Sequence, residues 1–93
     1  MAQLTPMADV DEVIADGEVR LRPASGASER VRVKVGRPRH LSDVPEDDWV
    51  CPVWMEDVTD GVQCFGGVSP VDSLMNAMEW VRSRCRELET ARR

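Results

Sequence analysis

The sequence predicts an α+β fold, in which a four-stranded antiparallel sheet packs on one C-terminal amphipathic helix. Residues 30–35 alternate apolar and charged side chains without exception, which is typical of a half-buried strand. Residues 10–22, 49–56 and 62–68 show the same tendency, so the expected order is β-β-β-β-α. Apolar residues then recur every three or four positions from residue 69 to the C-terminus, as in a helix that covers a sheet.

A chain of 93 residues has room for one domain with a thin core. Residues 1–9 show no sustained periodicity and are expected to form a flexible N-terminus. Residues 10–93 are expected to form a single α+β domain. Small turn-forming residues at 23–28 separate the first two strands, which suggests an antiparallel hairpin. Residues 36–48 contain two prolines and an acidic cluster, and they predict a long exposed connection.

The third and fourth strands are expected to form a second hairpin, because Asp60-Gly61 is a strong turn signal. Strict alternation in the third strand places Cys51 on the helix-covered face and Trp54 on the opposite face. In the fourth strand we expect Cys64 to point toward the helix and Phe65 to point away from it.

The helix has a clear start signal. Ser69 can cap it, Pro70 suits its first position, and Asp72 follows at the positive end of the helix dipole. One apolar stripe is expected to cover the sheet, and it consists of Val71, Leu74, Met78, Val81, Cys85 and Leu88. Trp80 falls off this stripe, so we expect it to be exposed.

Composition narrows the classes of function. A net charge of −5 and a pI near 4.8 argue against binding to nucleic acid and favour a protein partner with a basic surface. No apolar stretch is long enough to span a bilayer, and the first residues lack the basic and apolar regions of a secretory signal. The expected location is therefore the cytoplasm, without a role at a membrane.

Metal or catalytic chemistry would depend on few residues. His40 is the single histidine, and Cys51, Cys64 and Cys85 could converge on it if all three cysteines pointed inward. The spacing lacks a C-x-x-C pair, and free cysteines are commonly core residues. We therefore expect no catalytic residue, metal ligand or cofactor, and we keep a small metal-dependent module or enzyme that uses these four residues as the alternative.

Aromatic, arginine and acidic side chains are the best candidates for protein contacts. Tryptophan and arginine anchor protein interfaces more often than other residues do. Trp54 and Phe65 would be neighbours on the outer sheet face. That face is either covered by the N-terminal segment or used as an interface, and the two rings could also form a homodimer. The candidate contact residues are Trp54, Phe65, Trp80, Arg84, Asp47 and Asp48.

Residues 36–81 resemble a family of small, uncharacterised bacterial proteins that is known only as a domain of unknown function. The resemblance is carried by Gly36-x-Pro38, by Asp48-Trp49-x-Cys51-Pro52 and by Val71-Asp72-Ser73-Leu74. It implies a bacterial origin and brings no activity, cofactor or site residue with it.

These observations together predict a non-enzymatic, acidic, protein-binding module. An immunity- or antitoxin-type inhibitor, or an accessory subunit of a bacterial complex, would fit its small size and its lack of a catalytic motif.

Overall fold

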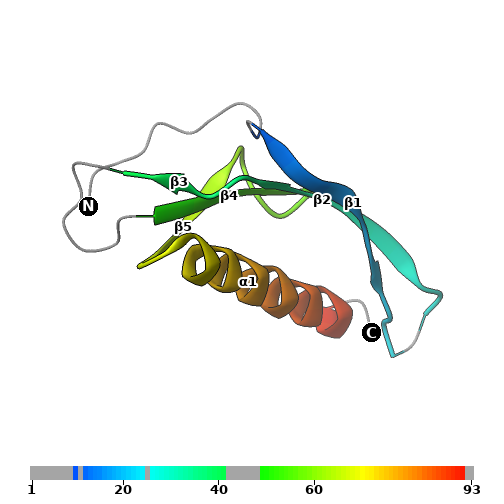
Figure 1. Cartoon of the computed structure of the whole chain (residues 1–93). Coiled ribbons are helices and arrows are strands. Elements are labelled where there is room, and N and C mark those ends of the chain that lie inside the picture. The colour runs from blue at the N-terminus through cyan, green and yellow to red at the C-terminus, as the bar shows by residue number, and fades with distance from the viewer. Residues whose placement is uncertain (1–9, 11, 25, 42–48, 92–93) are drawn as a thin grey trace.

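The chain folds into an antiparallel sheet that packs against one C-terminal helix (Figure 1). The predicted α+β fold is therefore confirmed. The computed structural model describes residues 10, 12–24, 26–41 and 49–91. The predicted flexible N-terminus, residues 1–9, lies outside the described residues. The elements are β1 (Val13–Leu21), β2 (Glu29–Gly36), β3 (Arg39–His40), β4 (Trp49–Met55), β5 (Gln63–Gly67) and α1 (Pro70–Ala91).

The sheet contains the four predicted strands and one short addition. β1 pairs with β2, β2 with β4, and β4 with β5, all antiparallel. The addition is β3, which pairs with Trp49 and Val50 of β4. Because β5 already occupies the other side of these two residues, β3 must lie on the same side of β4 as β2. The predicted connection 36–48 therefore includes a strand that extends the line of β2.

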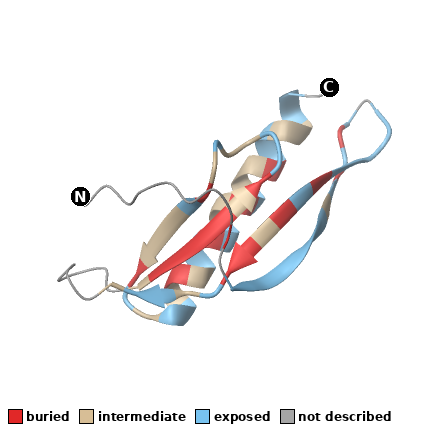
Figure 2. Cartoon of the chain, turned by 90° about the horizontal axis from the view of Figure 1, so that it is seen from above, coloured by how far each residue is buried: buried red, intermediate tan, exposed pale blue. Residues whose placement is uncertain are grey.

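The core lies between the sheet and α1. Alternation along the strands places Val31, Val33 and Val35 of β2 on the inner face, together with Cys51, Val53 and Met55 of β4, and all six are buried. Figure 2 shows the contrast between β4, which is buried along most of its length, and β1, which is mostly exposed. Alpha-helix α1 contacts β4 and β5 far more than it contacts β1.

The start of α1 is as the sequence predicts. The Ser69 hydroxyl oxygen accepts a hydrogen bond from the Asp72 backbone N–H at 3.0 Å. The Asp72 carboxylate accepts one from the Val68 backbone N–H at 2.9 Å. The first bond satisfies a backbone donor of the first helical turn, and the second ties the chain just before α1 to that turn. Together they fix the direction in which the chain leaves β5.

The face of α1 that packs on the sheet differs from the predicted stripe. Ser73 and Ala77 are completely buried, whereas Val71 is 65% exposed and Met78 is 36% exposed. Small side chains at 73 and 77 let the helix backbone come close to β5 at Gly67. The helix is therefore rotated about its axis relative to the expectation, and Val71 and Met78 are not core residues.

The outer face of the β1–β2 hairpin is polar and crossed by ion pairs. Asp16 accepts two hydrogen bonds from Arg32, at 3.0 Å from Nε and 2.9 Å from Nη2. Glu18 pairs with Arg30 at 3.5 Å. The bidentate contact of Arg32 lowers the pKa of the Asp16 carboxyl, chiefly through the hydrogen bonds and then through the positive charge. Among the described residues, no helix is both long and apolar enough to cross a membrane.

This pair gives a pH-dependent prediction. A carboxyl whose pKa is lower in the folded chain stabilises it above its unfolded pKa, about 3.9, and this contribution is lost as the pH falls through the folded pKa. We expect NMR titration to give Asp16 a pKa below 3.9 and Arg32→Met to raise it. The difference in unfolding free energy between the two proteins should shrink at low pH. Arg37→Met, which removes the contact with Glu12 instead, should leave the pKa of Asp16 unchanged.

Candidate binding groove

Three of the predicted contact residues lie together between α1 and β5. The ring centroids of Phe65 and Trp80 are 5.0 Å apart, and the guanidinium carbon of Arg84 lies 5.7 Å from the centroid of the Trp80 ring. Arg84 also forms an ion pair with Glu87 on the same helix. Phe65 and Trp80 are half-buried and pack against the core. Trp80 therefore helps to hold α1 on the sheet, and the expectation that it is exposed is wrong.

Trp54 lies on the other face of the sheet. It pairs with Lys34, whose Nζ is 5.6 Å from the centroid of the Trp54 ring. Phe65 pairs with Cys51 of the inner face, so the prediction that Trp54 and Phe65 are neighbours on one face is wrong. A homodimer that used both rings at once would need them on the same face. The other two predicted contact residues, Asp47 and Asp48, lie outside the described residues.

The cysteines divide between the two faces of the sheet. Cys51 is buried on the inner face, and its thiol donates a hydrogen bond to the Gly36 carbonyl oxygen at 3.6 Å. Burial raises the pKa of the Cys51 thiol to about 11. Cys64 lies directly opposite Pro52 and points outward, so the expectation that all three cysteines point inward is wrong for Cys64. Cys85 is buried on α1.

His40 does not join the cysteines in a recognisable site. Its ring contacts the Trp49 ring edge to face, with the centroids 5.2 Å apart, and it lies in the exposed strand β3. In the described ranges, no group of three or more His, Cys, Asp or Glu side chains is placed to hold a metal ion. The alternative function, which needs His40 and all three cysteines on one face, loses its geometric basis with the outward position of Cys64.

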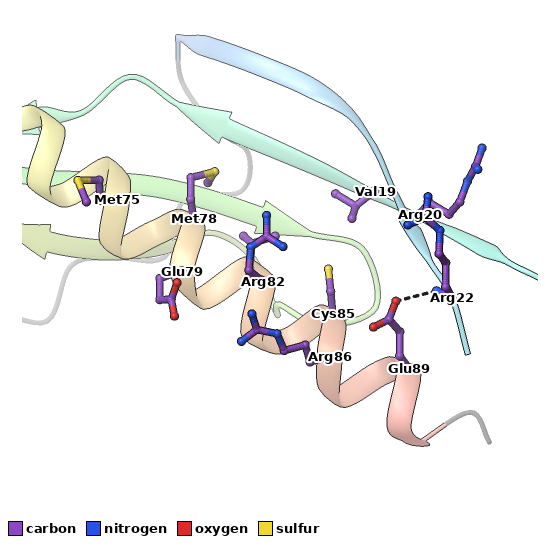
Figure 3. A pocket seen from close by; sticks show the side chains of 11 residues that line it. Val19, Arg20, Arg22, Met75, Met78, Glu79, Arg82, Cys85, Arg86 and Glu89 are labelled. Carbon is purple, nitrogen blue, oxygen red and sulfur yellow. Dashed lines mark hydrogen bonds between the residues drawn. The ribbon is translucent and has the colours of Figure 1, made fainter. Parts of the chain in front are cut away.

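A groove that the sequence did not predict opens between α1 and β1 (Figure 3). Its volume is about 680 Å³. Val81 and Cys85 belong to the hydrophobic core, so the groove reaches the core itself. Met75 is 64% exposed and Met78 is 36% exposed, and Met78 points from the helix toward β1. With Val19 of β1, these side chains give the groove its apolar lining.

The groove is also lined by charged side chains, with an excess of positive charge. Four arginines and two glutamates border it: Arg20, Arg22, Arg82, Arg86, Glu79 and Glu89. Arg20 lies opposite Arg30 and points to the outer face of the sheet, so three arginines and the two glutamates face the groove. The Glu89 carboxylate accepts a hydrogen bond from the Arg22 backbone N–H at 2.7 Å, which closes one end of the groove (Figure 3). Within the described part of the chain, none of these four arginines takes part in an ion pair. The groove is thus locally positive on a chain whose net charge is −5.

The lining offers no activated nucleophile. Cys85 is its single cysteine, and burial raises the pKa of this thiol, with the nearby Glu89 carboxylate acting in the same direction. A thiol with a raised pKa stays protonated at neutral pH and reacts slowly. The arrangement can hold a surface that is apolar and carries acidic groups.

The groove was missed because the helix was expected in a different orientation. The predicted stripe assigned Met78 to the core. The alternation pattern of a strand also does not show where that strand lies relative to the helix, so the space between β1 and α1 could not be predicted. One signal was present: Ser73 and Ala77 follow Gly66-Gly67, and small residues that face each other allow close packing. A helix that packs on this small-residue face leaves Met75 and Met78 at its side.

Comparisons of the chain with protein-family models, with curated proteins and with solved structures find no match. The resemblance of residues 36–81 to small bacterial proteins therefore stays a prediction.

Proposed function

We propose that the protein is a non-enzymatic protein-binding module and that the groove between α1 and β1 is its binding surface. The observation that carries the proposal is the pair of methionines, Met75 and Met78, exposed beside an opening that reaches the core. Flexible, polarizable methionine side chains are common on surfaces that adapt to protein partners. A folded chain gains nothing from exposing them, since their burial by a partner would be favourable.

The charges around the groove support a protein partner over a small molecule. Small-molecule sites usually combine an apolar cavity with a few polar groups that converge inside it. Here many charged side chains stand beside apolar ones, with Arg82 between Met78 and Cys85, and such a mixed surface is common at protein interfaces (Figure 3). The unpaired arginines select a segment that carries acidic residues beside apolar ones.

Within this class we propose an immunity- or antitoxin-type inhibitor, or an accessory subunit of a bacterial cytoplasmic complex. A domain of 93 residues acts most simply by covering a surface of its partner. The net charge of −5 would attract a protein that is basic overall, while the positive groove receives an acidic segment of that protein.

Selection from a phage-displayed library of random peptides tests this function without assuming a partner. Counter-selection uses a Met75→Glu/Met78→Glu variant, and the control variant is Val68→Glu, because Val68 is exposed and lies outside the groove. We expect enriched peptides that bind the wild-type and control proteins equally and bind the groove variant at least about tenfold more weakly. A selection that yields no groove-dependent peptide contradicts the proposed function.

A further inference from the structure

The sheet is wider than the helix that covers it. Four neighbouring strands span roughly 14 Å between the axes of the outermost pair, while a helix with its side chains is roughly 10–12 Å across. Because α1 lies mainly on β4 and β5, the far edge of the inner face remains uncovered. The register confirms this at β1. Ala15 and Gly17 face the same side as their buried partners Val35 and Val33, and yet both are exposed.

The groove lies between the flank of α1 and the end of β1, where Val19 lines it, and the uncovered strip continues from there along β1. The strip runs alongside the helix, so a second rod of similar thickness could lie beside α1 and beneath β1. The small residues Ala15 and Gly17 leave space for side chains from such a rod. An added strand would instead bind at the free edge of β1 and would leave the groove unfilled.

We propose that the groove receives an amphipathic α-helix of a partner protein, with an apolar stripe facing Met78 and Val81 and acidic residues on its flanks. This inference rests on the proposed function and specifies the partner. The seated helix completes a two-helix layer beneath the sheet, and its carboxylates meet the arginines on both sides of the groove.

The charges favour a foreign helix over a second copy of this chain. On the groove side of α1, Arg82 and Arg86 are balanced by Glu79 and Glu89. A second α1 would bring no net negative charge to neutralise Arg22, the arginine that lines the groove next to β1. A helix with glutamates or aspartates beside its apolar stripe would neutralise it.

Three synthetic peptides test the inference against the full chain. The first is an amphipathic helix with a leucine stripe and glutamate flanks; in the second, lysines replace the glutamates; the third is the first with two central prolines, which break the helix. Binding is followed by NMR. We expect the first peptide to shift the signals of Val19, Met78 and Val81, and to bind at least about tenfold more tightly than either of the others.

Paired variants test the charge contribution. We expect Arg82→Gln/Arg86→Gln to weaken binding of the glutamate peptide by about tenfold, with a smaller difference at high salt. Arg30→Gln is the matched control, because Arg30 lies on the outer face and is paired with Glu18. Circular dichroism of each variant shows that the fold is retained.

The possible failures are distinguishable. If the proline peptide binds as tightly as the first peptide, or if the binders selected from the random library are not helical, the helical partner is overturned. The proposed function then remains intact. Equal binding of the lysine peptide overturns its acidic character. Light scattering that shows a dimer of the free chain, abolished by Met75→Glu, assigns the groove to a second copy and overturns the foreign partner. A library without groove-dependent binders overturns the proposed function, and this inference falls with it.

Discussion

Substitution of Gly67 by alanine is expected to lower the free energy of unfolding by about 3 kcal/mol or more. A Cβ atom built on Gly67 would lie 2.3 Å from the backbone nitrogen of Ser73, 2.7 Å from its Cα and 2.8 Å from the carbonyl carbon of Asp72. All three are backbone atoms, so no side-chain rotation can relieve the clash. The start of α1 would have to move away from β5, and the buried contacts of Ser73 would be lost.

Urea unfolding followed by tryptophan fluorescence measures this loss, since the chain contains three tryptophans. Gly17→Ala is the matched control, because a Cβ at Gly17 meets nothing within 4 Å. We expect the control to stay within about 0.5 kcal/mol of the wild type. If Gly67→Ala were as stable as Gly17→Ala, the close packing of α1 on β5 would be wrong.

The contact at Gly67 also explains which parts of the fold were predictable. Strand β2 alternates strictly, and Ser69 and Asp72 identify the helix start by local chemistry alone, so these elements were found from sequence. The orientation of α1 depends on the close approach of Gly67 in β5 to Ser73 in α1, a contact between two elements that a local pattern does not show. By hydrophobicity alone, Val71 and Met78 would be placed in the core before Ser73. In the structure Ser73 is buried, and Val71 and Met78 are exposed.

The register of β5 was unpredictable for a related reason. In the segment Gln63–Gly67, Cys64 and Phe65 are adjacent and both apolar, so alternation cannot decide which of them points inward. The connection between β4 and β5 decides it: the Val58 and Thr59 backbone N–H groups donate to the Met55 carbonyl oxygen, and Asp57 and Gly61 have φ values of 62° and 86°. In the observed register, Phe65 lies on the helix side beside Trp80 and Cys64 points outward. For this reason Trp54 and Phe65 do not share a face, and the three cysteines do not converge.

The groove follows from the same rotation of α1. A helix oriented by its most apolar stripe would have buried Met78 and narrowed the space beneath β1. The observed orientation buries Trp80 against Phe65 and leaves the methionine side of the helix open. Stability and binding therefore depend on different sides of one helix, and substitutions should separate them.

Two methionines make that separation measurable. Met55 is completely buried in β4, whereas Met75 is 64% exposed at the groove. Met55→Ala removes core contacts and leaves a cavity, so we expect it to lower the free energy of unfolding by about 2–5 kcal/mol. Met75→Ala should change that free energy by no more than about 0.5 kcal/mol. Urea unfolding of the two variants compares the same chemical change at the two places.

Binding should show the opposite order. At a temperature where both variants are folded, we expect Met75→Ala to weaken the glutamate-flanked helix peptide by about threefold or more, and Met55→Ala to leave its affinity unchanged. The physical reason is that the side chain of Met75 is exposed in the free protein and would be buried by the partner in the complex. The side chain of Met55 is buried in both the free and the bound protein. Equal losses of affinity in the two variants would mean that binding reports only the stability of the fold, and that α1 does not present a separate binding side.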